Sequence, residues 1–424
     1  MFNPQFIIYK LSDDKPILLK YLDHEDNIIF SPYMNLPMIS LGYHAYVKNA
    51  KNSLFTTINK LQRQNNDLYY IVNPFEYNIS NYDESLKISS NIYFNNKYEY
   101  KKEFYILWEI MFIFNIFNES KKEQEYLIIS DNPCDYLYSI VNYYSKINEY
   151  TNKYKINIIN ISSNESTEIC TENLNIPKKS INIINSNIKK FYKNKLNKNN
   201  LIILDINIKI DDFILVDQEP KFYDILFNTI YIIFNYLEQD GNAILKIYDT
   251  FTLPTIKLIY LLNNMFDEIY IYKPFLSRQT DSDKYIILKK FKIDNDLDKK
   301  IKIFENIQKE INSNNNYILD IFPKLIIPEE YINKFKFINI KLVNPQQYMI
   351  HEIIKYINEN NYFGEKYHIY REKQIEFSKW WKYTFYPPSN NLVIKNKEEI
   401  IKLFDNNLEK NIIEMNNFFS IPKI

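Results

Sequence analysis

Short apolar runs alternate with helical stretches between residues 100 and 292, and this alternation constrains the fold more than any other feature of the sequence. The strand candidates are 126–130, 155–162, 181–185, 201–206, 242–248, 268–274 and 284–292. The helix candidates are 100–118, 134–147, 221–239 and 254–266. Strands that alternate with helices are typical of βαβ units. The sequence therefore predicts an α/β fold with a mostly parallel sheet covered on both faces.

The connection between the last two strand candidates indicates where the sheet changes direction. Only the short loop PFLSRQTDSD lies between them, whereas a parallel crossover needs a dozen or more residues. We therefore expect these two strands to pair antiparallel. A parallel sheet that finishes in an antiparallel hairpin is the order expected of the Rossmann-like methyltransferase sheet.

The chain is longer than one compact domain usually is, with 424 residues, so we expect a core domain with additions at both ends. Residues 1–95 mix short apolar runs, polar breaks and prolines, and we interpret them as an irregular N-terminal extension. Residues 96–294 form the predicted methyltransferase-like domain. Residues 295–424 are predicted to be mainly helical.

The charge balance limits the ways in which the chain can meet a partner. Lys and Arg together number 52, as do Asp and Glu, so the formal net charge is zero. A strongly basic field is therefore excluded, and any contact with RNA must come from a local patch. No stretch reaches the roughly 18 uncharged apolar residues that a membrane helix needs, so we expect no membrane partner.

Residues 241–292 carry the most specific pattern in the chain. A lysine lies near the end of a buried strand, and a helix, another strand and a loop follow. The pattern consists of Lys246, Lys273-Pro274, Ser277-Arg278, Asp283 and Tyr285. It closely resembles the late motifs of the FtsJ-like RNA 2′-O-methyltransferases. The members of this family in large cytoplasmic DNA viruses are the most similar, in the segment KIYDTFTLPT and in the later segment NNYFGEKYHIYREKQ.

The resemblance implies a catalytic set of Lys, Asp, Lys and Glu at the carboxyl ends of the strands. Its Asp matches Asp205, its second Lys matches Lys246, and its Glu position holds Asp283, which is one methylene shorter. A ribose 2′-hydroxyl is a poor nucleophile, and a nearby lysine can orient it or accept its proton. We expect burial and a neighbouring cation to lower the pKa of Lys246 for this purpose.

The first lysine of the set has no counterpart in register. The stretch EFYILWEI aligns with the family's helix and puts Ile106 at that place. Lys101 and Lys102 are the two candidates that could replace it from the preceding turn. Asp283 also has an alternative interpretation, as a loop residue paired with Arg278.

The resemblance implies S-adenosylmethionine as the cofactor, bound by the loop after the first strand of the sheet. By order, this loop is IISDNPCDYL, so Asp131, Asn132 and Pro133, together with Asp205, are the cofactor-binding candidates. The chain has only 3 glycines, and none is in this loop. Glycine tolerates positive φ and lets the backbone approach a ligand. We therefore predict weak cofactor binding or none.

Other candidate sites carry less information. His351 and His368 are far apart in sequence with no cysteine nearby, so no metal site is predicted. The Trp380-Trp381 pair could stack on nucleic-acid bases or pack the C-terminal segment against its domain; packing is our preferred interpretation.

Two functions are compatible with these features. The first is an S-adenosylmethionine-dependent RNA 2′-O-methyltransferase, which by resemblance to the viral group acts on the cap of mRNA. The second is a catalytically degenerate methyltransferase fold that serves as a structural or binding subunit of a virus particle or transcription complex. The expected partners are RNA, capped mRNA above all, and viral proteins. The expected location is the host cytoplasm, at a viral factory, or the virion.

Overall fold

The computed structural model describes most of the chain. The described residues are 5–11, 21–22, 27–34, 39–60, 71–76, 100–117, 123–147, 153–161, 181–185, 197–208, 218–359, 364–387 and 389–420. Within these ranges no helix is long and apolar enough to cross a membrane.

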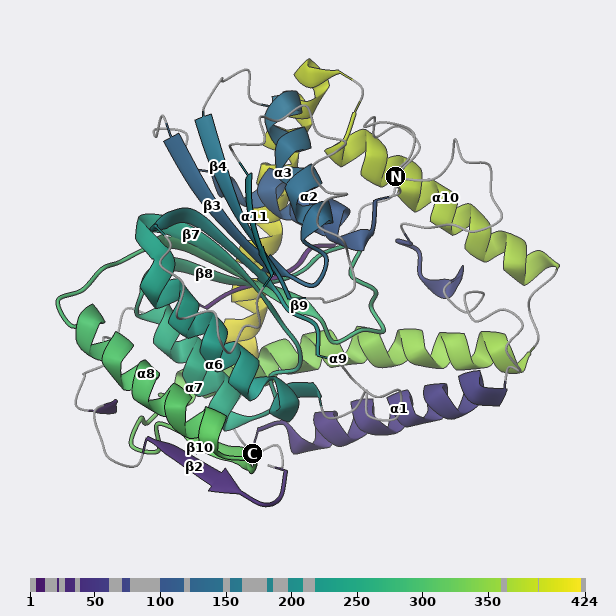
Figure 1. The fold of residues 1–424 in the computed structure, drawn as a ribbon. Helices are drawn as coiled ribbons and strands as arrows, with labels where there is room; N and C mark the ends of the chain where they lie inside the picture. Colours follow the sequence, from purple (N-terminus) through teal and green to yellow (C-terminus); the bar gives the residue numbers. More distant parts are fainter. Residues whose placement is uncertain are drawn as a thin grey trace.

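An eight-stranded sheet forms the centre of the molecule (Figure 1). Its strands, in spatial order, are β1 (Ile7–Lys10), β8 (Phe266–Lys273), β9 (Lys284–Phe291), β7 (Leu237–Ile247), β6 (Asn199–Asp205), β3 (Glu123–Ser130), β4 (Lys153–Asn160) and β5 (Ile181–Asn185). The five strands from β7 to β5 pair in parallel. Strand β9 is antiparallel to both β7 and β8. The predicted mostly parallel sheet with a final antiparallel hairpin is thus confirmed.

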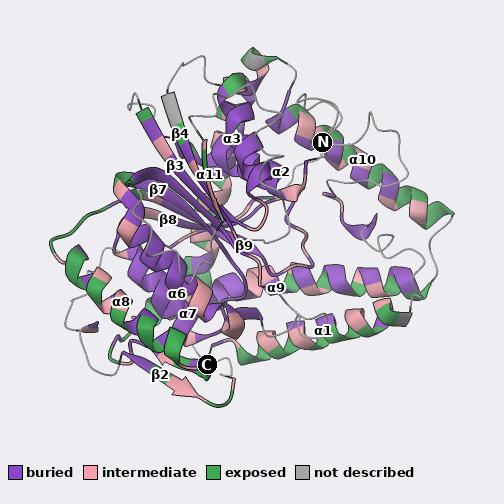
Figure 2. Cartoon of the chain, in the orientation of Figure 1, coloured by how far each residue is buried: buried purple, intermediate pink, exposed green. Residues whose placement is uncertain are grey.

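Helices cover both faces of the sheet and create two apolar cores. On one face lie α6 (Gln218–Tyr236), α7 (Leu253–Asn263) and α8 (Leu297–Ser313), and on the other lie α2 (Lys102–Phe114) and α3 (Pro133–Ile147). Side chains alternate between the cores along β3, since Leu127 packs in the first core and Ile128 in the second. This is the alternation of a pleated strand. The central strands are accordingly buried throughout, whereas exposed residues line the outer sides of the helices (Figure 2).

The terminal segments extend this core. Strand β1 adds an antiparallel edge strand beside β8, and β2 (Ile28–Ser31) pairs with β10 (Tyr317–Ile321). Long helices follow β10, namely α9 (Glu329–Asn358), α10 (Glu365–Phe385) and α11 (Asn390–Ser420).

Helix α1 (Leu41–Lys60) packs along α9, in a region that the sequence pattern predicts to be irregular. Its buried positions have the spacing of a helix, but several of them are polar or small. Val47 and Ala50 are buried, and Lys51 is buried beside them. Hydrophobic periodicity therefore does not reveal this helix.

Candidate active site

The predicted site residues meet at the carboxyl edge of the sheet. Asp205 ends β6, and its register partner on β3 is Ser130, the residue before Asp131. Lys246 lies at the same end of β7, opposite Tyr285 of β9. Open α/β sheets place their ligands at this edge. The sheet therefore brings together residues that lie more than 100 positions apart in the sequence.

A buried ion pair joins Lys246 and Asp205. Lys246 Nζ lies 2.9 Å from Asp205 Oδ1, and only 2% and 1% of the two side chains are exposed. The other carboxylate oxygen, Oδ2, accepts hydrogen bonds from the hydroxyls of Tyr136 and Tyr285. The carboxylate is thus held from three sides, and it fixes the position of the ammonium group.

The expectation of a lowered pKa at Lys246 is wrong. Burial disfavours the ammonium form, but the carboxylate of Asp205 in contact with it outweighs this effect and holds the pKa of Lys246 well above its ordinary value. Lys246 is therefore a cation at neutral pH. In this form it can orient a hydroxyl group and stabilise negative charge on its oxygen, but it cannot accept a proton.

Asp283 lies in a second cluster of charges. Its Oδ1 accepts hydrogen bonds from Lys273 Nζ at 3.2 Å and from Ser277 Oγ at 2.9 Å. Its Oδ2 lies 3.7 Å from Lys102 Nζ. Although burial opposes ionisation, the ammonium groups of Lys273 and Lys102 hold the pKa of Asp283 far below its usual range. Asp283 is thus an ionised carboxylate between two lysines.

Arg278 does not pair with Asp283. Its guanidinium forms a two-pronged ion pair with Glu76, with Nε–Oε2 and Nη2–Oε1 distances of 2.9 and 3.1 Å. The alternative interpretation of Asp283 as a partner of Arg278 is therefore wrong. Arg278 instead ties the loop after β8 to residues 71–76.

Lys102 comes closest to the missing first lysine. Ile106 is completely buried in the apolar core beneath α2, so it contributes nothing polar to the site. Lys102 begins α2 and reaches Asp283, whereas Lys101 Nζ contacts Asn132 Oδ1 at 3.3 Å. The structure thus places four charged residues in two adjacent pairs, Lys246–Asp205 and Lys102–Asp283.

Residues 155–291 match the model of the FtsJ-like methyltransferase family. This segment belongs to that family. It contains Asp205, Lys246 and Asp283, whereas Asp131 and Lys102 precede it.

Several known proteins resemble the chain. An uncharacterised protein of Acanthamoeba polyphaga mimivirus is 28% identical over 233 residues, which are 53% of this chain and 62% of that protein. A cap-specific mRNA (nucleoside-2′-O-)-methyltransferase of Dictyostelium discoideum is 36% identical over 113 residues, which are 27% of this chain and 15% of that enzyme. An enzyme of the same description from Autographa californica nuclear polyhedrosis virus is 29% identical over 100 residues, which are 20% of this chain and 38% of that enzyme. The chain therefore spans less than two thirds of each relative.

Among solved structures, an rRNA methylase from Streptococcus thermophilus is 15% identical, covers 43% of this chain and 93% of its own, and has a TM-score of 0.28. A TM-score this low carries no argument. The assignment of residues 155–291 to the FtsJ-like family rests on the match to the family model, and the sheet order agrees with it.

The FtsJ-like fold implies S-adenosylmethionine as cofactor, and the turn after β3 is where it would bind. Asp131 and Asn132 connect β3 to α3, which begins at Pro133. Asp131 Oδ2 accepts a hydrogen bond from the backbone N–H of Asn207 at 2.7 Å, and the N–H of Asn132 donates to Ser130 Oγ at 3.0 Å.

No residue from 131 to 136 has a positive φ. The turn therefore does not require the conformation that favours glycine, and this part of the reason for expecting weak cofactor binding is wrong.

The polar residues at this edge fit the chemistry of S-adenosylmethionine. Ser130 at the end of β3 is in register with Asn160 at the end of β4 on one side and with Asp205 on the other. Hydroxyl, amide and carboxylate groups in a row suit a ligand with an amine, a carboxylate and ribose hydroxyls. Within the described ranges, by contrast, no cluster of three or more His, Cys, Asp or Glu residues could hold a metal ion.

Sequence reasoning misses two residues of this site, Tyr136 and Asn207, and it gives Tyr285 no role beyond its place in the family-like pattern. Tyr136 and Tyr285 bind the carboxylate of Asp205, and Asn207 contacts Lys246. Tyrosine is too common in this chain, at 38 residues, for Tyr136 to stand out. The only signal for Asn207 is its place two residues after Asp205.

The Trp380-Trp381 pair packs the C-terminal region against α2 and the loop after β8. Trp381 is completely buried, and its Nε1 donates a hydrogen bond to Glu109 Oε2 at 3.1 Å. The same carboxylate accepts hydrogen bonds from the Tyr272 hydroxyl and from the backbone N–H of Phe275. The preferred interpretation of this pair as a packing element is confirmed for Trp381.

Proposed function

We propose that the protein is an S-adenosylmethionine-dependent RNA 2′-O-methyltransferase that acts on the cap of mRNA. The observation that carries the proposal is the contact of 2.9 Å between Lys246 and Asp205 in the FtsJ-like segment, beside the Lys102–Asp283 pair. These residues supply a fixed cation and a fixed carboxylate at the edge where a parallel sheet binds ligands.

The chemistry follows from the charges of these groups. When bound, S-adenosylmethionine supplies a methyl group that is open to attack by an oxygen. The ammonium of Lys246 would hold the ribose 2′-hydroxyl and stabilise the negative charge that grows on its oxygen during the transfer. Asp205 holds Lys246 in place and keeps it cationic. The hydroxyl proton would leave to solvent, because Lys246 is already protonated.

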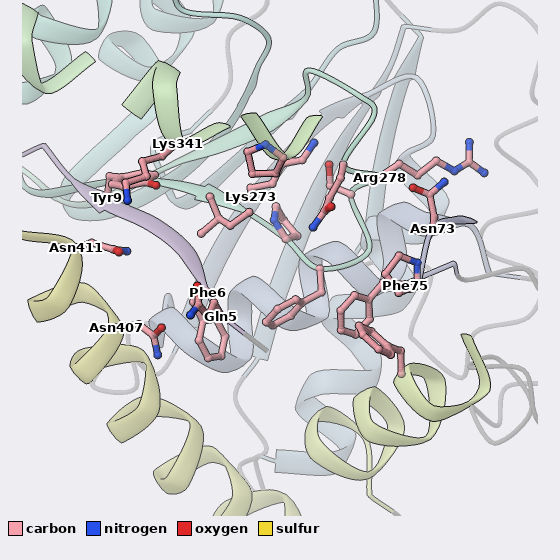
Figure 3. A pocket seen from close by; sticks show the side chains of 18 of the residues that line it. Gln5, Phe6, Tyr9, Asn73, Phe75, Lys273, Arg278, Lys341, Asn407 and Asn411 are labelled. Carbon is pink, nitrogen blue, oxygen red and sulfur yellow. The ribbon is translucent and has the colours of Figure 1, made fainter. Parts of the chain in front are cut away.

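A cavity beside the site supports a nucleotide substrate (Figure 3). It has a volume of about 480 Å³ and borders the loop that follows β8, and ligand pockets commonly occupy about 300–1,000 Å³. Its lining includes the aromatic side chains of Phe6, Phe75, Phe275 and Phe377 and the cationic side chains of Lys273, Arg278, Lys341 and Lys410.

This lining suits RNA in two ways. Aromatic faces can stack on bases, and Phe275 already packs between Phe6 and Phe75 at centroid distances of 5.1 and 5.0 Å. Lys410 offers a positive charge for phosphates in a chain whose net charge is zero, whereas Lys273, Arg278 and Lys341 are paired with Asp283, Glu76 and Glu414. Lys273 lies in the wall of the cavity and also contacts Asp283, so the cavity is next to the proposed reaction site.

The relatives favour the cap as the substrate. Two of the relatives described above, from Dictyostelium and from a baculovirus, carry the name of cap-specific mRNA 2′-O-methyltransferase. The viral relatives are the reason for proposing viral proteins as further partners and the host cytoplasm or the virion as the location.

The alternative is a catalytically degenerate subunit, and it rests on Ile106 and on the loop without glycine. Lys102 beside Asp283 and the ordinary backbone of residues 131–136 weaken both arguments. We therefore favour the enzyme.

A methyl-transfer assay tests the proposal. Tritiated S-adenosylmethionine is incubated with the full chain and capped RNA, and the control RNA already carries a 2′-O-methyl group on its first nucleotide. We expect label in the first RNA and much less in the second. Equal labelling of both would disprove the first nucleotide as target. No labelling of any RNA, with the cofactor bound in calorimetry, would favour the degenerate subunit.

A further inference from the structure

We propose that Asn207 is a positioning residue for Lys246 and that it links this lysine to the turn after β3. The inference rests on the proposed function, because it assigns a role in the same reaction. Asn207 follows β6 and is two residues beyond Asp205.

The side chain of Asn207 faces Lys246. Its Oδ1 accepts a hydrogen bond from Lys246 Nζ at 2.7 Å. The Tyr248 hydroxyl lies 3.5 Å from the same oxygen, at the limit of a hydrogen bond. Since an ammonium group only donates hydrogen bonds, the amide oxygen is the atom that must face it, and this fixes the orientation of the amide.

Two acceptors are needed to aim a lysine. Its ammonium is a compact charge on a flexible four-carbon chain, so one ion pair alone allows rotation about that contact. Asn207 Oδ1 accepts a hydrogen bond from Nζ at 2.7 Å, whereas Asp205 Oδ1 attracts Nζ as an ion pair at 2.9 Å, without hydrogen-bond geometry. Among the described residues no other acceptor contacts Nζ, so N–H groups of Lys246 remain for the hydroxyl of a substrate.

The backbone of Asn207 is held from the cofactor side. Its N–H donates to Asp131 Oδ2 at 2.7 Å, and Asp131 is the half-exposed first residue of the turn after β3. A ligand that contacts Asp131 would therefore act on the position of Asn207, and through it on Lys246. This chain of contacts offers a route by which an occupied methyl-donor site aligns the lysine for the ribose.

Substitution of the side chain separates the two contacts of Asn207. Any variant keeps the backbone N–H that binds Asp131, so the loop retains its anchor. Asn207→Ala removes the acceptor for Lys246, whereas Asn207→Asp keeps an oxygen at the same distance. A matched control is Asn235→Ala on α6, since the Asn235 amide donates to the carbonyl of Tyr231, at 2.9 Å, one turn earlier in the same helix.

The test combines kinetics with a measurement that needs no turnover. We expect Asn207→Ala to lower kcat by up to about 100-fold, the effect of a misplaced reacting group, with the KM for S-adenosylmethionine within about twofold of wild type. Asn207→Asp should recover most of kcat, and Asn235→Ala should match wild type. In ¹⁵N-lysine NMR at pH 6, the ammonium signal of Lys246, identified by its loss in Lys246→Arg, should vanish through fast proton exchange in Asn207→Ala and persist in Asn207→Asp.

Unchanged kcat and an unchanged ammonium signal in Asn207→Ala would overturn the inference. If the wild-type protein methylates no RNA, the proposed function fails, but the NMR signal still decides whether Asn207 positions Lys246. If the alanine variant does not fold, Asn207→Ser replaces it, because the serine hydroxyl is too short to reach Nζ.

Discussion

Lys246 Nζ and Asp205 Oδ1 lie 2.9 Å apart, and both side chains are almost completely shielded from solvent. A buried charge without a partner is costly, and the carboxylate of Asp205 keeps Lys246 in its ammonium form by raising the pKa of the lysine. The pair is therefore fixed before any substrate arrives, and in the proposed reaction the lysine would present a cation to the ribose.

Lys246→Ala should abolish methyl transfer while it leaves S-adenosylmethionine affinity nearly intact. In the proposed reaction the ammonium acts on the 2′-hydroxyl and not on the methyl donor, and loss of one group that stabilises the developing negative charge typically costs about 10²–10³-fold. The measurements are tritium transfer to capped RNA and calorimetric binding of the cofactor. Lys289→Ala is the control, because Lys289 pairs with Glu268 on β8, away from this site. Full activity in Lys246→Ala would remove this residue from the mechanism.

Asp283→Glu should keep or raise the rate. The Asp283 Oδ2 to Lys102 Nζ distance of 3.7 Å is longer than a hydrogen bond, and one more methylene allows the carboxylate to close it. Asp283→Asn should lower both the rate and the melting temperature, because it leaves the buried cation of Lys273 without its charged partner. A folded Asp283→Glu protein without activity would contradict this explanation.

Lys102→Ala should lower kcat by about 100-fold, the effect of removing one charge-stabilising group from a reaction site. Lys101→Ala is a closely matched control, since it removes the neighbouring lysine, which contacts Asn132 instead of Asp283. Both variants are compared in the same transfer assay at saturating cofactor. Equal losses in the two variants would mean that the general positive charge of this turn matters, and not a specific contact of Lys102.

The sheet and the main charged pair could be predicted from the sequence because both depend on local pattern. Asp205 and Lys246 stand at the ends of apolar runs, so alternation of strands and helices places them at one edge. Lys102 could not be assigned, because its reach depends on where α2 begins. The sign of the pKa shift at Lys246 could not be predicted either. The sign depends on whether the carboxylate of Asp205 contacts Lys246 or is displaced from it by one residue along the strand. Only the register of β6 and β7 determines which of the two holds.

Glu109 should make the stability of the protein depend on pH. It is completely buried, and burial raises its pKa to about 7 despite hydrogen bonds from Tyr272, Phe275 and Trp381. In the unfolded chain it ionises near pH 4.5. Its contribution to stability is therefore fully present below about pH 4.5 and is lost as the pH rises to about 7. A shift of this size corresponds to about 3 kcal/mol.

Glu109→Gln removes this titration. Between pH 4.5 and pH 7 the free energy of unfolding of wild type should therefore fall by about 3 kcal/mol relative to that of the variant. Urea denaturation at several pH values measures the difference. The absolute stability of the variant is not the test, because an amide nitrogen beside the Trp381 N–H cannot accept its hydrogen bond, and that loss is the same at every pH. Glu398→Gln, at an exposed position on α11, should show no such trend. Parallel curves of the free energy of unfolding against pH for wild type and Glu109→Gln would contradict this prediction. They would mean that Glu109 ionises at the same pH in the folded and the unfolded chain. The buried side chain would then be a charged carboxylate beneath the C-terminal helices at neutral pH.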